Sequence, residues 1–217
     1  MMVTDRHRVG AGAGAGAVID ALVDAAARAA RCGATMIQVR ERGLDDGVLL
    51  ELAARIVEQT AAAGVKVVVN DRVDVALASG ADGVHLPAHG APPERVRPIV
   101  PPGFLIGRSV HAEAEAVEVA RGGACDYLIF GSVFETASKP GGHVPAGIDA
   151  LARVCGAVPL PVIAIGGIVP DRARPDRLIA VARAGAAGIA AIGMFAGGDE
   201  GTLRAAVQQI EDAFAAE

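Results

Sequence analysis

Aromatic side chains are scarce in this sequence, at 3% of the residues, and tryptophan is absent. Basic residues are also outnumbered, with 20 lysines and arginines against 25 aspartates and glutamates, so the formal net charge is −5. A surface that binds nucleic acid needs a basic stripe or aromatic rings on which bases can stack. The composition therefore argues against a nucleic-acid partner.

Cysteine is sparse as well. The chain has Cys32, Cys125 and Cys155, an odd number at wide spacing, which indicates neither a disulfide framework nor a zinc site. No apolar run reaches transmembrane length, and charges stand near the N-terminus where a signal peptide would carry its apolar core. We expect a cytoplasmic protein without a membrane partner.

Apolar side chains are what the chain has in quantity, at 52% of 217 residues, with 21% charged. This balance is typical of a globular protein and argues against disorder. We expect one domain over residues 1–217, and the apolar composition leaves room for a homodimer. The Gly/Ala-rich run at residues 10–17 does not fit the G-x-G-x-x-G register, so we interpret it as a flexible loop.

Short apolar runs that are typical of buried strands alternate with helical stretches. The predicted strands are residues 1–4, 36–40, 66–70, 83–86, 105–108, 127–131, 162–165 and 188–192. The helical period is clearest in VLLELAARIVEQT, where Leu49, Leu52 and Ile56 share one stripe and Glu51 and Glu58 fall on the other side. The C-terminal segment repeats this pattern.

Eight strands alternating with helices predict a parallel sheet covered by helices. About 215 residues suffice for a compact (β/α)8 TIM barrel, which is the predicted fold. An open, doubly wound sheet is the alternative. Such a sheet would usually carry a glycine fingerprint after its first strand, where this chain has Thr4, Asp5 and Arg6 instead.

Polar residues gather where these strands end, which in TIM barrels is the working face. In QVRER, the residues Gln38, Arg40 and Arg42 alternate onto one face of the second strand. The other polar strand ends are Asn70 with Asp71, His85, Arg108 with Ser109, and the loop FGSVFETASKP at residues 130–140. A connecting turn needs neither two hydroxyls nor a cation, so this loop indicates a binding site.

Glycines follow the last two predicted strands, in AIGGI (Gly166, Gly167) and in AAIGMF (Ile192, Gly193). Glycine lets backbone N–H groups approach an anion closely, and loops after strands seven and eight are a frequent phosphate site in this fold. We therefore expect one phosphate there. Arg40, Arg42 and Lys139 could hold a second, separate anionic group.

A metal site is suggested at one position. His85 and His89 have the spacing of a helical ligand pair, but Pro87 lies between them and argues against a helix. Asp71 is the better candidate, because a carboxylate beside a phosphorylated ligand suits Mg²⁺.

Read in order, these segments resemble the thiamine-phosphate synthase/TenI family. The likeness runs from about residue 3 to about residue 195 and rests on TDR, QVRER, NDRVDVALASGADGVHL, GRSVH, YLIFGSVFETASKPG, PVIAIGGI and GIAAIGMF. It implies a (β/α)8 barrel and a transferase that, with Mg²⁺, joins hydroxymethylpyrimidine diphosphate to thiazole phosphate and releases pyrophosphate.

The resemblance also implies roles for single residues. It places the diphosphate against Gln38, Arg40 and Asn70, Mg²⁺ on Asp71, the pyrimidine near Ser109, and phosphates along a loop lined by Thr136, Ser138 and Lys139. Backbone amides around Gly167 and at Ile192 and Gly193 would take the thiazole phosphate. Arg40, Ser109 and Lys139 are the expected catalytic residues, since cations and donors stabilise charge that gathers on the leaving pyrophosphate.

Three departures separate this chain from the synthase branch. HLPAHG lacks the acidic residue that normally supplies a second Mg²⁺ ligand, Arg42 replaces a lysine, and Glu135 stands where proline is usual. The sister branch, the thiazole tautomerases, is similar in FGxVFET but uses a histidine where this chain has Ser132. A serine cannot replace imidazole as a proton shuttle near neutral pH.

Three functions follow as hypotheses. The first is a synthase-type transferase that acts on small phosphorylated substrates. The second is a tautomerase-like isomerase that uses Glu135 or His111 as its acid/base. The third is a protein that binds thiazole phosphate or thiamine phosphate without turnover. Dependence on Mg²⁺ separates the first from the other two.

Overall fold

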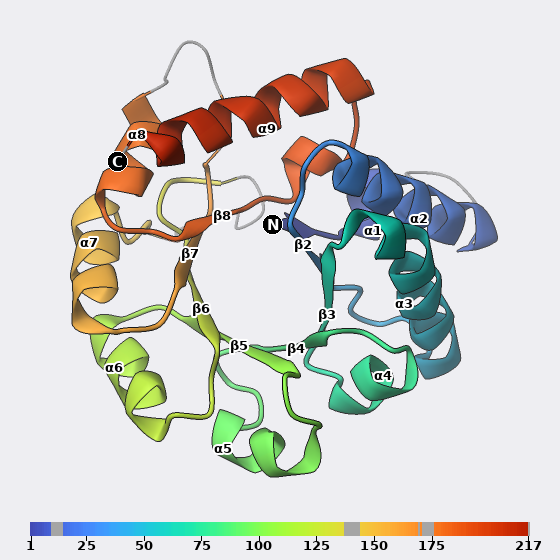
Figure 1. The fold of residues 1–217 in the computed structure, drawn as a ribbon, viewed down its shortest axis with the longest axis horizontal. Coiled ribbons are helices and arrows are strands. Elements are labelled where there is room, and N and C mark those ends of the chain that lie inside the picture. The colour runs from blue at the N-terminus through green and yellow to red at the C-terminus, as the bar shows by residue number, and fades with distance from the viewer. Residues whose placement is uncertain (10–14, 137–143, 169, 171–175, 217) are drawn as a thin grey trace. The chain divides into compact units, whose positions relative to one another are not determined.

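The computed structural model describes residues 1–9, 15–136, 144–168, 170 and 176–216. Strands alternate with helices along the chain (Figure 1). The strands are β1 (Met2–Val3), β2 (Met36–Val39), β3 (Lys66–Asn70), β4 (Gly83–Leu86), β5 (Leu105–Val110), β6 (Tyr127–Gly131), β7 (Val162–Ile165) and β8 (Gly188–Ala190). The α-helices are α1 (Arg6–Val9), α2 (Ala15–Arg31), α3 (Asp46–Thr60), α4 (Val73–Ala78), α5 (Pro93–Val96), α6 (Glu113–Gly122), α7 (Ile148–Ala157), α8 (Asp176–Arg183) and α9 (Glu200–Ala215). Short 3₁₀ helices are η1 (Ala61–Ala63), η2 (Arg97–Ile99) and η3 (Gly193–Phe195).

Within the described residues, eight strands form one sheet in the order of the chain, from β1 to β8. The paired strands run parallel, for example β2 with β3 and β6 with β7. A doubly wound sheet reverses its strand order at a switch point, so this sequential order excludes that alternative. The predicted (β/α)8 class is confirmed.

The predicted bounds are right for β3, β4, β6 and β7. The prediction was wrong at the fifth strand, which runs on to Val110 and so includes Ser109, and at the eighth, which already ends at Ala190. The first two strands are shorter than predicted by one or two residues. Strand ends carry polar residues, and a hydropathy pattern says little about where hydrogen bonding stops there.

The Gly/Ala-rich run is not a loop throughout. Residues 15–17 form the first turn of α2, and residues 10–14 lie outside the described part. Alanine has the highest helix propensity, and the apolar stripe that begins with Ile19 and Leu22 buries this helix, so the run is recruited into it.

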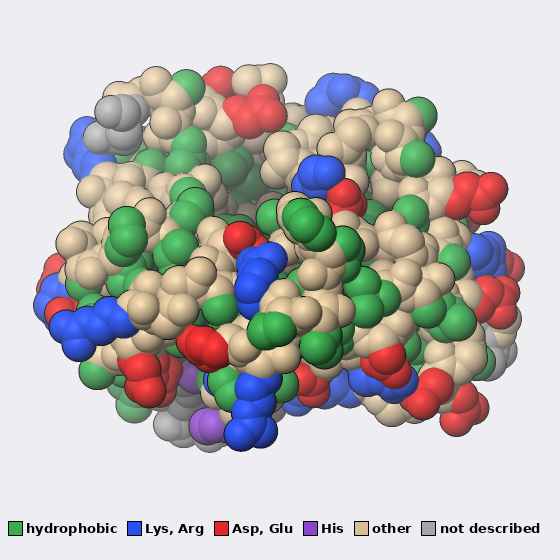
Figure 2. Space-filling view, turned by 60° about the horizontal axis from the view of Figure 1, so that its bottom comes forward, with side chains coloured by type: hydrophobic (Ala, Val, Ile, Leu, Met, Phe, Trp, Pro, Cys, Tyr) green, Lys and Arg blue, Asp and Glu red, His purple; other side chains and the backbone are tan. Residues whose placement is uncertain are grey.

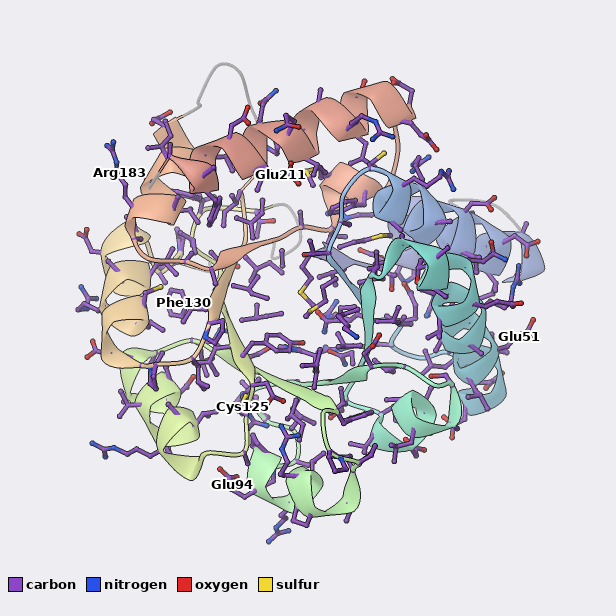
Figure 3. All side chains as sticks on the ribbon, in the orientation of Figure 1. Glu51, Glu94, Cys125, Phe130, Arg183 and Glu211 are labelled. Carbon is purple, nitrogen blue, oxygen red and sulfur yellow. The ribbon has the colours of Figure 1, made fainter. Side chains whose placement is uncertain are left out.

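The chain divides into two compact units. Unit one comprises Met1–His85, Pro101–Leu105 and Ile192–Val207, and unit two comprises Leu86–Val100, Ile106–Ala191 and Gln208–Glu217. In unit one, α2 packs on α3, which covers β3. Leu52 and Ile56 are fully buried on this helix, as its predicted stripe requires, whereas Glu51 extends outward (Figure 3). A single domain over the whole chain stays a prediction.

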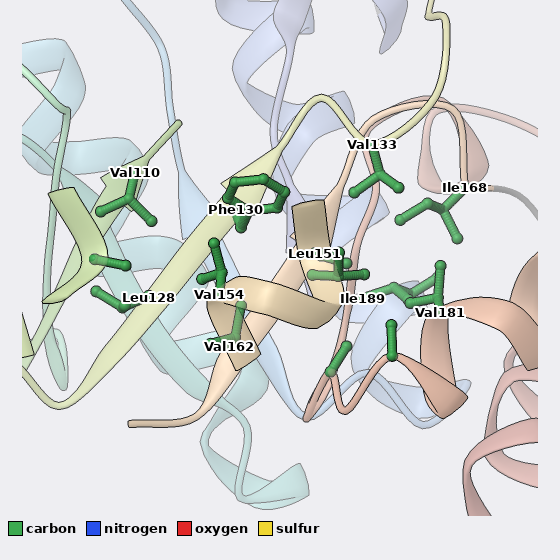
Figure 4. Close-up of a cluster of buried hydrophobic side chains, with 14 of the residues drawn as sticks. Val110, Leu128, Phe130, Val133, Leu151, Val154, Val162, Ile168, Val181 and Ile189 are labelled. Carbon is green, nitrogen blue, oxygen red and sulfur yellow. The ribbon is translucent and has the colours of Figure 1, made fainter. Parts of the chain in front are cut away.

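Unit two has its own apolar core, shown in Figure 4. Strand residues Leu128, Phe130 and Val162 pack there against Leu151 and Val154 of α7. Because these side chains are at most 2% exposed, they anchor the C-terminal ends of β6 and β7, from which the candidate site residues project.

The surface carries mixed charges. On the face in Figure 2, acidic and basic side chains are interspersed with apolar ones and form no continuous basic area. No helix among the described residues is long and apolar enough to span a membrane.

Candidate active site

In unit one, two predicted site residues are in direct contact. Gln38 of β2 donates through Nε2 to Oδ1 of Asn70 at the end of β3, at 3.1 Å. Gln38 pairs with Val68 in the parallel register, so Asn70, two residues further on, shares its face. Gln38 is only 3% exposed, so the bond forms where water competes little. The two side chains therefore form one preorganised polar group.

Two cations follow Gln38. Arg40 is anchored by its backbone N–H, which donates to Oγ1 of Thr4 at 2.9 Å, while its guanidinium hydrogen-bonds to no described residue. Partial burial, and then the nearby charge of Arg42, lower the pKa of Arg40. Both effects destabilise the charged form of Arg40, and an anion bound beside it would stabilise that form. Glu41, which stands between Arg40 and Arg42 in the sequence, is buried.

Asp71, the expected Mg²⁺ ligand, follows directly after β3. It is exposed, it has φ +66°, and its N–H donates to the carbonyl oxygen of His85 at 2.9 Å. Its carboxylate contacts no hydrogen-bonding partner among the described residues. The next residue, Arg72, instead binds Asp74 and Asp46. Asp71 thus keeps its lone pairs available.

The described residues contain no cluster of three His, Cys, Asp or Glu side chains that could hold a metal ion. His85 lies inside β4 and His89 in the loop after it, so the helical histidine pair is absent, as predicted from Pro87. One exposed carboxylate fits Mg²⁺ where a phosphorylated substrate supplies the other oxygens, because Mg²⁺ commonly binds one or two carboxylates together with phosphates.

The turn at Ile192 and Gly193 leads into η3. A Cβ atom on Gly193 would lie 3.5 Å from Nη1 of Arg8, so this arginine flanks the turn. Arg28 of α2 donates to the carbonyl oxygen of Phe195 at 3.1 Å and holds the far end of η3. Sequence reasoning missed both arginines. Arg8 follows the TDR motif closely, but nothing in the sequence connects it to a glycine so far along the chain.

In unit two, the end of β5 presents Ser109, which is half-buried, and beyond it His111. Nδ1 of His111 lies 2.7 Å from the carbonyl oxygen of Gly131. Since a carbonyl only accepts, Nδ1 carries a proton in this contact, and Nε2 is the ring nitrogen left for another partner. The N–H of His111 also donates to Glu115, at 2.7 Å. The ring is therefore held in one orientation.

The segment after β6 packs directly on the glycine turn after β7. The N–H of Val133 donates to Ile165 at 2.9 Å, and that of Phe134 donates to Gly166 at 3.0 Å. A Cβ atom on Gly167, which has φ +65°, would meet the carbonyl oxygen of Glu135 at 2.3 Å. Glycine is thus required here by close packing as well as by backbone conformation.

Thr136, half-buried, ends the described part of this loop, and Ser138 and Lys139 lie outside the described residues. The N–H groups of Gly166, Gly167 and Ile168 donate to none of the described residues. Successive free amides in a glycine turn form an anion-binding concavity. These amides are available as donors within the described residues, and the phosphate position stays a prediction.

The thiols play no part in this chemistry. Cys125 is buried with Sγ 3.1 Å from the carbonyl oxygen of Tyr127, and burial raises its pKa to about 11. Burial also raises the pKa of Cys155, while Cys32 is buried as well. A thiol that stays protonated near neutral pH is a poor nucleophile.

The strand order defines a (β/α)8 protein. The amides of its glycine turn and the guanidinium of Arg40 hydrogen-bond to no described residue, and groups of these kinds suit a phosphorylated ligand. The family model described as thiamine monophosphate synthase matches residues 2–195. The thiamine-phosphate synthase of Methanoculleus marisnigri is 45% identical over 193 residues, 89% of this chain and 88% of the relative. That of Roseiflexus castenholzii is 39% identical over 191 residues, 88% of this chain and 78% of the relative.

A solved structure agrees. Thiamine phosphate pyrophosphorylase from Pyrococcus furiosus superposes with a TM-score of 0.79 at 31% identity, covering 99% of this chain and 94% of that one. The chain belongs to the thiamine monophosphate synthase family. The family resemblance inferred from the motifs is thereby confirmed.

Proposed function

We propose that this chain is a transferase of thiamine biosynthesis, which couples hydroxymethylpyrimidine diphosphate to thiazole phosphate and releases pyrophosphate. Family membership and the names of the relatives support the reaction class. The observation that carries it on the molecule is the Gln38–Asn70 hydrogen bond next to Asp71, whose carboxylate hydrogen-bonds to none of the described residues. A protein that merely bound thiazole phosphate would need neither feature.

In this reaction, Asn70 and Arg40 bind the diphosphate. With Oδ1 of Asn70 occupied by Gln38, the amide N–H groups of Asn70 remain to donate to phosphate oxygens. Arg40 adds a guanidinium that hydrogen-bonds to no described residue, and its positive charge stabilises the negative charge that gathers on the leaving pyrophosphate. Arg42 is exposed and supplements this field.

Asp71 would hold Mg²⁺. When bound, the ion would neutralise the diphosphate and stabilise the departing pyrophosphate. The family resemblance in the sequence assigns the thiazole phosphate to amides around Gly167 and at Ile192 and Gly193, and the pyrimidine to the neighbourhood of Ser109, and these assignments stay predictions. Holding the thiazole nitrogen against the reacting CH₂ group makes the attack effectively intramolecular, and this supplies much of the rate gain.

Lys139, with Thr136 and Ser138, is assigned to the diphosphate from the sequence. Lys139→Ala is expected to weaken use of the diphosphate substrate far more than affinity for thiazole phosphate. Equal losses in both would show that the two anions have been placed wrongly. A cytoplasmic location and a homodimer stay predictions, and sedimentation of the purified protein tests the second.

The test of the function is direct. Purified protein is incubated with both substrates and Mg²⁺, and thiamine phosphate is sought by mass spectrometry. Product that disappears with EDTA supports the transferase. Absence of product from protein that still binds thiazole phosphate contradicts it.

One observation keeps the isomerase as a second candidate. Ser132 is buried and brings no titrating group, but His111, held through Nδ1, offers Nε2 as a base near the end of β6. If the transferase assay fails, loss of a proton-transfer activity in His111→Gln would support this function instead.

A further inference from the structure

Arg177, the second residue of α8, joins two segments of unit two that the proposed function assigns to different substrates. Its Nη1 donates to the carbonyl oxygen of Gly167 at 3.3 Å. Its guanidinium carbon lies 4.7 Å from the centre of the Phe134 ring, which is a cation–π contact. Gly167 belongs to the thiazole-phosphate turn, and Phe134 precedes Thr136 of the diphosphate loop by two residues.

The two segments also touch each other without Arg177. Phe134 donates its N–H to Gly166 at 3.0 Å, and a Cβ atom on Gly167 would come within 2.8 Å of Cβ of Phe134. The backbone of the turn therefore lies directly against the Phe134 segment, with no room for a side chain at Gly167. Arg177 contacts both parts, so it ties the position of one to the position of the other.

The bond to Gly167 also sets the direction of a donor. In a planar trans peptide the carbonyl group and the following N–H point in opposite directions. Because the carbonyl of Gly167 points to Arg177, the N–H of Ile168 points away from it. That N–H donates to none of the described residues, and Ile168 is 2% exposed. Arg177 thus orients an amide that a phosphate would use.

We propose that Arg177 is a positioning residue that couples thiazole-phosphate binding at Gly166 and Gly167 to diphosphate binding at the segment of residues 134–136. This inference rests on the proposed function for the identity of the two ligands. Anion binding draws the amides of the turn into one arrangement, and the shared contacts of Arg177 bring the Phe134 segment with them. Coupling of this kind is reciprocal.

Pyrophosphate serves as the probe for the diphosphate site, because it cannot react with thiazole phosphate. Its dissociation constant is measured by calorimetry with Mg²⁺, with and without saturating thiazole phosphate. For the unaltered chain we expect thiazole phosphate to tighten pyrophosphate binding about tenfold, within the usual range for coupled sites. Absence of coupling in the unaltered chain overturns the proposal.

Three variants then locate the coupling. Arg177→Gln and Phe134→Leu should each reduce the tightening to less than about twofold, by removing either side of the cation–π contact. Arg177→Lys keeps the positive charge but loses the planar guanidinium, so this variant should retain part of the tightening of pyrophosphate binding. The matched control is Arg183→Gln. Arg183 is on the same helix, its side chain is directed outward (Figure 3), and its replacement should leave the full tightening of pyrophosphate binding.

Two results would contradict the inference. If Arg177→Gln lowers only the melting temperature and leaves the coupling intact, the residue is structural. If it weakens thiazole-phosphate binding while Phe134→Leu keeps full coupling, Arg177 is a direct phosphate ligand. Turnover is assayed separately, so a chain that couples the two anions but makes no thiamine phosphate contradicts the proposed function and not this inference.

Discussion

Gln38 and Asn70 face each other across neighbouring parallel strands, with Nε2 of the first 3.1 Å from Oδ1 of the second. The direction of this bond decides what Asn70 can offer a ligand. Its oxygen is occupied by a buried donor, and its N–H groups are left for an acceptor. An asparagine held in this way suits an anionic substrate.

Gln38→Glu should reverse that preference. A carboxylate only accepts, so Asn70 would turn its amide N–H toward position 38 and present its oxygen to the diphosphate. We expect the KM for the diphosphate substrate to rise roughly 10- to 100-fold, the loss of one or two charge-assisted hydrogen bonds. Steady-state kinetics measure this, and the KM for thiazole phosphate is the internal control. An unchanged diphosphate KM would show that Asn70 does not bind this substrate.

Asp71→Asn should abolish the Mg²⁺ requirement together with most of the activity. Asparagine tolerates the left-handed φ of +66° at this position, whereas alanine would add backbone strain of about 1–2 kcal/mol. We expect kcat to fall at least about 100-fold, the scale on which a transition-state charge contact acts. Magnesium titration of the rate measures it. Asp74→Asn, whose carboxylate is bound by Arg72, is the control and should keep the Mg²⁺ response.

Gly167→Ala is compared with Gly64→Ala, because both glycines have φ +65° but only the first has atoms where a Cβ would lie. Gly64→Ala should lower the free energy of unfolding by about 1 kcal/mol through backbone strain. In Gly167→Ala the new Cβ atom would also overlap with the carbonyl oxygen of Glu135. This variant should therefore lower the free energy of unfolding several-fold more, or displace the turn, and it should lose thiazole-phosphate binding. Urea unfolding and calorimetry measure the two effects. Equal behaviour of the two variants would contradict the close packing.

Glu41 should make the unaltered chain less stable as the pH rises. Its side chain is 2% exposed, and burial raises its pKa above the ordinary 4.5, although hydrogen bonds from Thr4 and Arg6 oppose the shift. Between the ordinary and the raised pKa the folded chain binds more protons than the unfolded chain, so the free energy of unfolding falls with increasing pH.

Glu41→Gln does not titrate, and its stability relative to the unaltered chain should therefore increase from about pH 4 to about pH 8. Urea unfolding at both values measures the difference. The exposed Glu51→Gln is the control. A difference that stays constant with pH would mean that burial does not govern this carboxyl.

The strand assignments follow from apolar periodicity, because fully buried strands such as Tyr127–Gly131 have continuous apolar runs. The polar strand ends are equally visible in the sequence. The resemblance assigns Gln38 and Asn70 to the same substrate, and the structure brings these two side chains into contact. Ser138 and Lys139 were predicted too, and they lie outside the described residues.

Arg8, Arg28 and Arg177 could not be found in this way. Arg8 and Arg28 lie near Gly193 and Phe195, which are far along the chain, and Arg177 donates to Gly167, ten residues before it, through geometry that no local pattern encodes. The start of α2 was missed for another reason, since a repetitive Gly/Ala run carries no periodicity and its helix is decided by the packing that follows it.

The shielding of the thiols has a practical consequence. Cys125, with its pKa raised to about 11, and the buried Cys32 should resist alkylation near neutral pH, and half-buried Cys155 should react slowly. Val144, next to residues 137–143, is 82% exposed. A cysteine in its place would take up a maleimide dye ahead of the native thiols, which gives a single-site fluorescent reporter five residues after Lys139 in the sequence without removing any residue of the core.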